Sequence, residues 1–112
     1  MSAAPISTHV LDLNRGEPAR GVAVRLERLG DGGTWRTVAE SRTDGDGRLR
    51  DWVTGDAWTA GDYRLVFAIE AYLGPPAFFP EVVVGFRVTD PAAHHHVPLL
   101  LNRHGYTTYR GS

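Results

Sequence analysis

The sequence predicts an all-β fold, with seven or eight short strands arranged as an antiparallel sandwich or barrel. Apolar residues recur at every second position along most of the chain, whereas a helical period of 3.6 residues is nearly absent. Glycines and prolines, 13 and 7 of the 112 residues, separate the alternating stretches and mark the turns between them. The length and the absence of repeats or linkers predict a single domain over residues 1–112.

The first half of the chain contains three stretches with strand-like alternation, at residues 6–12, 21–29 and 35–42. The clearest of them places Val22, Val24 and Leu26 on one face. The stretches at residues 21–29 and 35–42 are joined by Gly-Asp-Gly-Gly at residues 30–33, a strong signal for a hairpin turn. A second glycine-rich turn, at residues 44–47, predicts that another strand begins just after it.

The second half adds four predicted strands, at residues 62–70, 81–89, 94–101 and 105–109. Tyr63, Leu65 and Phe67 alternate with polar or smaller residues and are expected in the core. Only residues 70–73 could form a helix, because Gly-Pro-Pro follows and ends it within about a turn. Pro98 lies inside a predicted strand and cannot donate to a ladder, which predicts an edge strand or a bulge.

Composition excludes several classes of function. The net charge of −1 provides no basic field for nucleic acid and no polybasic surface for a membrane. The chain has no cysteine, which excludes disulfides and thiolate metal sites and fits a reducing compartment. No secretory signal and no apolar run of membrane-spanning length are visible, so a cytoplasmic protein is expected.

Three consecutive histidines precede an apolar strand near the carboxyl end. Alternation places His94 and His96 on one face of this strand and His95 on the other. Such a stretch is often only a solvated strand end, but three histidines together favour a site. A histidine pair on one face could also bind zinc if His9 or His104 supplied a further ligand, although a metal-free site is favoured.

Other motifs carry less information. Asp-Gly-Asp-Gly at residues 44–47 opens like a calcium loop, but Arg48 occupies the next ligand position and no glutamate closes twelve residues. The four residues are therefore interpreted as a turn, after which Arg48 enters a strand that could aim its guanidinium. The sequence has no Gly-x-Ser-x-Gly element, no phosphate-binding glycine loop and no carboxylate pair typical of glycosidases.

Several separated segments together resemble the transthyretin-like protein family. They are Ser-Thr-His-Val-Leu-Asp at residues 7–12, Thr-Asp-Gly-Asp-Gly-Arg at 43–48, Phe-Pro-Glu-Val at 79–82, His-Val-Pro-Leu-Leu-Leu at 96–101 and Tyr-Arg-Gly-Ser at 109–112. The resemblance covers nearly the whole chain. It implies a transthyretin-like sandwich of two four-stranded antiparallel sheets with one short helix, assembled as a homotetramer that is a dimer of dimers.

The histidines and the terminal Tyr-Arg-Gly-Ser resemble the enzymatic branch of this family, the 5-hydroxyisourate hydrolases. This resemblance implies hydrolysis of 5-hydroxyisourate to 2-oxo-4-hydroxy-4-carboxy-5-ureidoimidazoline in urate degradation, without a metal or cofactor, in a cleft where two dimers meet. The catalytic residues that it implies are His9, Arg48, His96 and Tyr109. The substrate-binding residues that it implies are Arg48, Arg110, Gly111 and Ser112.

The chemistry of these residue types suits hydrolysis of a ring amide. Histidine titrates near neutral pH, so one imidazole can activate water while the other acts as its partner. His9 is expected as the base and His96 as the partner, with the order left open. Arg48 and Arg110 are expected to hold the anionic ring, and one of them can also face the developing oxyanion, while Tyr109 either positions water or assists the arginines.

The sequence departs from the family pattern at two places, and other functions stay open. His95 replaces a tyrosine that is usual between the two histidines, and residues 102–104 replace a Ser-Pro turn. The alternatives are a transthyretin-like carrier of a small ligand, a structural or interaction module without a site, and a metal-dependent hydrolase. Turnover of the substrate, and its response to a chelator, would distinguish these alternatives.

Overall fold

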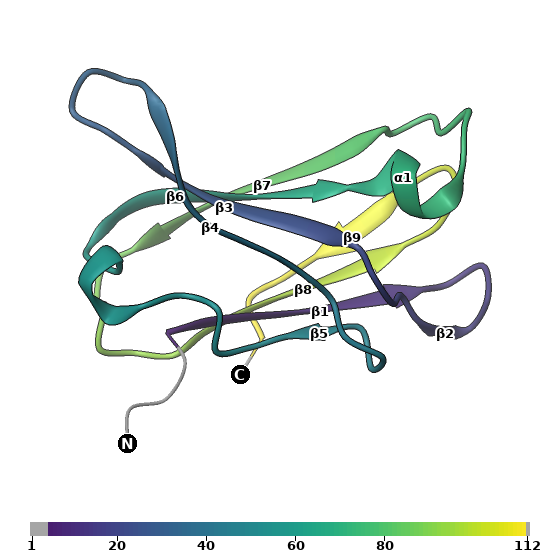
Figure 1. Cartoon of the computed structure of the whole chain (residues 1–112), viewed down its shortest axis with the longest axis horizontal. Helices are drawn as coiled ribbons and strands as arrows, with labels where there is room; N and C mark the ends of the chain where they lie inside the picture. Colours follow the sequence, from purple (N-terminus) through teal and green to yellow (C-terminus); the bar gives the residue numbers. More distant parts are fainter. Residues whose placement is uncertain (1–4, 112) are drawn as a thin grey trace.

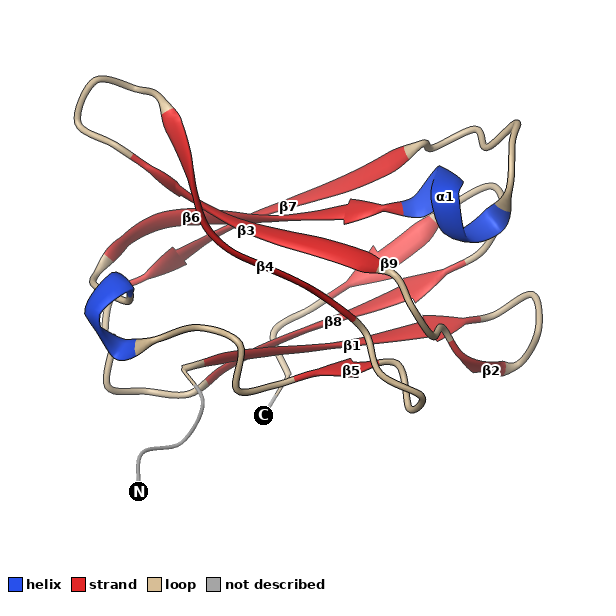
Figure 2. Ribbon diagram, viewed as in Figure 1, coloured by secondary structure: helices blue, strands red, loops and turns tan. Residues whose placement is uncertain are grey.

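The protein, described here from a computed structural model, is a sandwich of two β-sheets with one short helix at one end (Figures 1 and 2). The structure describes residues 5–111. Its strands are β1 (Ile6–Asp12), β2 (Glu17–Pro18), β3 (Ala23–Leu29), β4 (Trp35–Arg42), β5 (Arg48–Leu49), β6 (Gly61–Ala68), β7 (Glu81–Val88), β8 (His95–Leu101) and β9 (Tyr106–Thr108). A 3-10 turn (Gly55–Ala57) precedes β6, and helix α1 (Ile69–Leu73) follows it directly. None of the described helices is long and apolar enough to cross a membrane.

The two sheets differ in strand number and direction. One has the order β4-β3-β6-β7 and is antiparallel throughout. The other has the order β2-β1-β8-β9, with β5 also paired to β1, and its β1–β8 ladder is parallel. The expectation of two four-stranded antiparallel sheets is therefore wrong for the second sheet, which has five strands and one parallel pair. No hairpin joins β1 to β8, because the chain reaches β8 from β7, which lies in the other sheet. Local turns therefore do not set the relative direction of β1 and β8.

The core lies between the sheets and confirms the predicted alternation. Side chains that are completely buried come from both sheets and include Ile6, Val10, Leu26, Tyr63, Leu65, Phe67 and Leu99. Consecutive core positions on each strand are two residues apart, as a pleated strand requires. The intervening residues of β1 and β8 consequently lie on the outer face of the five-stranded sheet, which is where the polar residues of interest gather.

Pro98 does not lie on an edge strand, because β8 runs between β1 and β9. Instead, the proline interrupts the ladder on the β9 side. Regular pairing of β8 with β9 covers only the last three residues of each strand, and an isolated bridge between His96 and Gly111 resumes the same register. Since Pro98 has no N–H to donate to the facing residue, Tyr109 and Arg110 are released from regular strand pairing.

A partly buried hydrogen bond connects α1 to the end of β1. The Tyr72 hydroxyl donates to Asp12 Oδ2 at 2.8 Å, while Oδ1 of the same carboxylate accepts the backbone N–H groups of Asn14 and Arg15. Asp12 is only 2% exposed, so these donors take the place of water at its carboxylate oxygens. Partial burial and the neighbouring Asp12 raise the pKa of Tyr72 to about 12, which keeps the hydroxyl protonated as a donor.

Replacing Tyr72 with phenylalanine is expected to lower the free energy of unfolding by about 1–3 kcal/mol, because a buried carboxylate oxygen then loses its donor. Urea denaturation followed by circular dichroism measures this change. Tyr109→Phe is the matched control, since Tyr109 is 56% exposed and the same hydroxyl is removed there without burying a charge. Equal stability of the two variants would contradict the role given to this hydrogen bond.

Candidate active site

His9, Arg48 and His96 come from three neighbouring strands and lie on the outer face of the five-stranded sheet. His9 on β1 is directly opposite Arg48 on β5. On the other side of β1, Ser7 is opposite His96 and His9 is opposite Pro98. Side chains that face each other across paired strands share one face of the sheet. The fold therefore brings together three of the residues implied by the sequence, although they are separated by up to 87 positions.

Ser7 bridges two histidines of this face. Its Oγ lies 2.8 Å from Nδ1 of His96 and 3.1 Å from Nε2 of His94. Ser7 is 7% exposed, so its hydroxyl is directed to these rings with little competition from water. The sequence prediction missed this serine, although its position two residues before His9 places both on one face of the strand.

His9 is oriented by the turn that precedes β5. Its Nε2 lies 2.9 Å from the carbonyl oxygen of Asp46. A carbonyl can only accept, so Nε2 carries the proton and Nδ1 is the remaining acceptor of the neutral ring. The turn itself is held by the Asp44 carboxylate, which accepts the N–H groups of Asp46 and Arg48. One turn therefore fixes the tautomer of His9 and the start of the Arg48 strand.

The carboxyl-terminal tail passes directly over His96. The N–H of Gly111 donates to the His96 carbonyl at 2.8 Å, which closes the isolated bridge. A Cβ atom on Gly111 would lie 2.5 Å from Cδ2 of the His96 ring, closer than real side chains approach. Glycine is required here by the close approach of the tail. Ser112, which the sequence also implied, lies outside the described residues.

Gly111→Ala is expected to lower kcat by about 100-fold, because the added methyl group must displace either the His96 ring or the tail from its working position. Steady-state kinetics measures this effect, with the thermal midpoint as a check on folding. Gly105→Ala is the matched control, since a Cβ there would meet only Asn102 Oδ1, at 3.8 Å. Unchanged kcat in Gly111→Ala would show that the tail does not need this close contact.

The electrostatic environment keeps His96 neutral. Partial burial lowers the pKa of His96 below its ordinary value, and the nearby charges of His94, Arg48 and His9 lower it further. A hydrogen bond from the ring to the Ser7 backbone opposes these effects but does not outweigh them. At neutral pH the ring is therefore predominantly uncharged and has one nitrogen lone pair, the form that a general base requires.

Arg48 supplies a cation that forms no ion pair with a carboxylate of the described residues. Among residues 5–111, the ion pairs involve Arg15, Arg25, Arg64 and Arg87, whereas Arg48 forms none. An arginine held on a strand next to His9 and near His96 is suited to bind a planar anion by charge-assisted hydrogen bonds. In the described part of the chain, no three histidine or acidic side chains are grouped closely enough to hold a metal ion.

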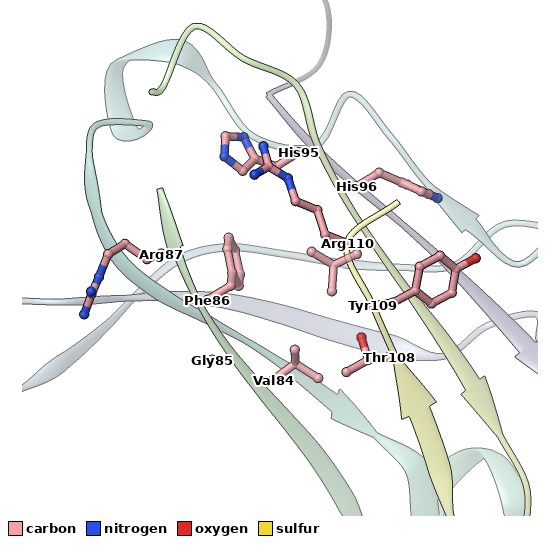
Figure 3. Close-up of a pocket in the computed structure, with 10 residues that line it drawn as sticks. Val84, Gly85, Phe86, Arg87, His95, His96, Thr108, Tyr109 and Arg110 are labelled. Atoms are coloured by element: carbon pink, nitrogen blue, oxygen red, sulfur yellow. The ribbon is translucent and has the colours of Figure 1, made fainter. Parts of the chain in front are cut away.

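Arg110 lies on the opposite side of the tail from Tyr109. Figure 3 shows its guanidinium beside the His95 ring, whereas Tyr109 projects in the other direction. Arg110 lines a pocket between the edges of the two sheets, together with His95 and Phe86. The structure thus brings Gly111 to His96, and His96 and Tyr109 also line the pocket of Arg110, while a substrate contact by Arg110 stays a prediction.

His95 belongs to the core, which confirms that it faces away from its two neighbours. It is 6% exposed, and its ring meets the Trp58 ring edge-on with centroids 5.5 Å apart. Its Nδ1 donates to the carbonyl oxygen of Ala93 at 2.9 Å. The replacement of tyrosine by histidine at this position therefore changes the packing between the sheets rather than the histidine pair on the outer face.

A sandwich that presents two histidines and an unpaired arginine on one sheet face is suited to acid–base hydrolysis of a small anion. The comparison with known families agrees with this class of protein. The model of the HIUase/Transthyretin family matches residues 6–111, and the chain belongs to that family.

Relatives and solved structures support the same assignment. A 5-hydroxyisourate hydrolase of Caulobacter vibrioides is 45% identical, over 96% of this chain and 97% of that protein. A 5-hydroxyisourate hydrolase of Mus musculus is 41% identical, over 98% of this chain and 97% of that protein. Transthyretin from Sparus aurata has a TM-score of 0.90 at 29% identity, over 96% and 97% of the two chains. Sea bream transthyretin in complex with thyroxine has a TM-score of 0.88 at 30% identity, over 96% and 94%. The predicted transthyretin-like sandwich is thereby confirmed.

Proposed function

We propose that this protein hydrolyses 5-hydroxyisourate to 2-oxo-4-hydroxy-4-carboxy-5-ureidoimidazoline, a reaction of urate degradation. Relatives that carry the name 5-hydroxyisourate hydrolase match almost the whole chain, so a hydrolase is the best-supported class of activity. The observation that carries the proposal is the convergence of His9, Arg48 and His96 on one sheet face. These residues supply a base, a second imidazole and a cation in one place.

His96 is proposed as the general base, which reverses the order first expected from the sequence. Its lowered pKa leaves it neutral at neutral pH. Its Nδ1 is engaged by Ser7, which leaves Nε2 for water. In the proposed step, Nε2 takes a proton from water while the water oxygen bonds to a ring acyl carbon. The C–N bond then breaks, and the protonated imidazole returns its proton to the leaving nitrogen.

The other groups have complementary roles in this proposal. Arg48 binds the anionic substrate and stabilises the oxyanion as it develops, a contribution typically of about 3 kcal/mol for a well-placed donor. His9 is held by the Asp46 carbonyl and presents its Nδ1 to the substrate or to water. Tyr109 positions water at the rim, and Gly111 keeps the tail close to His96.

The direct test follows the ultraviolet absorbance of 5-hydroxyisourate freshly generated by urate oxidase. The expected result is accelerated decay that a chelator does not alter, because imidazole and guanidinium groups suffice for each step. Decay at the spontaneous rate would contradict the proposal. Loss of activity in the presence of chelator would instead assign the histidines to a metal and support a metal-dependent hydrolase.

The pH profile gives a further expected result. Because the pKa of His96 is lowered from its usual 6.5, the base stays neutral to a lower pH than an ordinary histidine. The acid limb of kcat/KM is therefore expected below pH 6.5, with activity lost as pH falls through the lowered value. Initial rates between pH 5 and pH 8 measure the limb. A limb above pH 6.5 would contradict the assignment of His96 as the base.

A carrier without catalysis is the second candidate, and the likeness to a thyroxine complex of sea bream transthyretin is the observation that favours it. A carrier needs a complementary pocket, but it does not need a neutral imidazole held in one tautomer next to a cation. Protection of 5-hydroxyisourate from spontaneous decay, in place of acceleration, would support the carrier.

A homotetramer is proposed as the working assembly, and a cytoplasmic location stays a prediction. The strands β7 and β9 end their sheets on the same side of the sandwich and leave unpaired backbone groups there (Figure 1). Exposed apolar side chains lie on these strands, with Val83 42% and Tyr106 41% exposed. Pairing of these edges between two copies would form a dimer, and light scattering of the purified protein measures whether two dimers associate.

A further inference from the structure

His94 and Ser7 form a hydrogen-bonded chain with His96 that the proposed catalytic roles do not use. Ser7 Oγ lies within hydrogen-bond distance of both rings, at 2.8 Å from His96 Nδ1 and 3.1 Å from His94 Nε2. The serine is buried by the parallel pairing of β1 and β8, which sets it directly opposite His96. His94 immediately precedes β8, two residues before His96, and is exposed to solvent.

The proton count of this chain couples the two rings. A serine hydroxyl has one proton to donate, so it cannot donate to both ring nitrogens at once. If the hydroxyl donates to His94 Nε2, then Ser7 Oγ accepts from His96 Nδ1–H, and His96 Nε2 has the free lone pair. If instead His94 Nε2 donates to Ser7 and the hydroxyl donates to His96 Nδ1, the His96 proton sits on Nε2. Of these two arrangements, only the first presents a base to the substrate.

We propose that Ser7 and His94 are positioning residues that hold His96 in the tautomer with the proton on Nδ1 and a free lone pair on Nε2. The hydroxyl of Ser7 links the two rings. It donates a hydrogen bond to His94 Nε2, and this sets the direction of the hydrogen bonds from His96 through Ser7 to His94. This inference rests on the proposed function for its consequence in catalysis, because it assumes that His96 is the base. The tautomer itself is a property of the protein alone.

The groups that surround His96 are consistent with this arrangement. Among residues 5–111, the titratable and charged side chains near it are His94 just before β8, His9 on β1 and Arg48 on β5, with Tyr109 on the same side of the tail. None of them is a carboxylate that could replace the serine as partner of Nδ1. In the described structure, the Nδ1 atom of His96 has Ser7 as its hydrogen-bond partner.

Kinetics of four variants and one control variant tests the catalytic consequence. Ser7→Ala is expected to lower kcat about 10- to 100-fold with little change in KM, less than the 10⁴-fold that a wrong tautomer costs a serine protease. Ser7→Thr keeps the hydroxyl and is expected to retain most of kcat. His94→Ala should resemble Ser7→Ala, and the double variant should be no worse than either, because all three break the same chain. His104→Gln, an exposed histidine in the 102–105 turn, is the matched control.

Long-range ¹H–¹⁵N NMR spectra of the imidazole rings test the tautomer without any substrate. The wild-type protein at neutral pH is expected to show His96 with its proton on Nδ1. Ser7→Ala and His94→Ala are expected to shift His96 toward the Nε2–H form, while His104→Gln leaves it unchanged. A wild-type ring already in the Nε2–H form, or one that neither variant alters, would overturn the proposal.

The two measurements separate this inference from the proposed function. If the wild-type protein fails to accelerate decay of 5-hydroxyisourate but the NMR spectra show the expected tautomer and its shift, only the proposed substrate is wrong. If turnover is present but Ser7→Ala retains wild-type kcat, the positioning role is wrong. Additive losses in the double variant would also overturn it, because His94 would then act independently of Ser7.

Discussion

Replacing His96 with glutamine is expected to lower kcat for 5-hydroxyisourate by about 10²- to 10⁴-fold, the usual contribution of a general base. Glutamine has a similar polar side chain but cannot take up a proton from water at neutral pH. The large effect is expected because this ring has the properties of a base in the structure. It is neutral, its Nδ1 is engaged by a buried serine, and the arginine beside it is unpaired in the described structure.

The measurement is steady-state kinetics on protein whose folding is verified by circular dichroism and thermal unfolding. His104→Gln makes the same chemical change at an exposed histidine in the 102–105 turn and should retain wild-type kcat. The His9→Gln variant completes the set, since a larger loss there than at His96 would restore His9 as the base. Near-native turnover by His96→Gln would remove this histidine from the mechanism.

Deletion of residues 109–112 is expected to reduce kcat/KM at least about 10³-fold while leaving the sandwich folded, since one oxyanion donor alone typically contributes 10²- to 10³-fold. The deletion removes the Tyr109 hydroxyl and the Gly111 backbone that closes over His96. The fold should persist because β9 retains its pairing with β8, and the Thr108 hydroxyl still donates to the Pro98 carbonyl at 2.7 Å.

Thermal unfolding and light scattering of the truncated protein verify fold and assembly, so that lost activity can be assigned to the site. Two point variants then divide the effect. Tyr109→Phe removes only the hydroxyl on the His96 side, whereas Arg110→Gln removes the guanidinium that lies beside His95. If Arg110→Gln alone reproduces the deletion, the arginine must turn toward the substrate in the working assembly. A truncated protein with wild-type kcat/KM would exclude the tail from catalysis.

The strands could be predicted well because their signal is local. Alternation over residues 21–29 and 62–70 reflects a buried and an exposed side of each strand, and the structure buries Val24, Leu26 and Phe67 accordingly. The short helix was also predictable, since Gly-Pro-Pro limits its length whatever the surroundings. The two-residue strand β2 and the 3-10 turn before β6 were not predicted, because elements so short have no period to detect.

The candidate site was only partly predictable. His9, Arg48 and His96 were identified through resemblance of separate segments to one family, and the structure places them on one face. Ser7 was missed, because a serine in a strand has no signal of its own until its partner across the ladder is known.

The sequence by itself determined the all-β class, the positions of the main strands and which face each side chain takes. Those features follow from side-chain alternation and from the conformational limits of glycine and proline, which act within a few residues. Only the tertiary structure decided that β1 and β8 pair in parallel, that Ser7 lies against His96 and that Arg110 turns toward His95. These contacts join residues far apart in the chain, and they depend on how two sheets bury a common core, which no local pattern specifies.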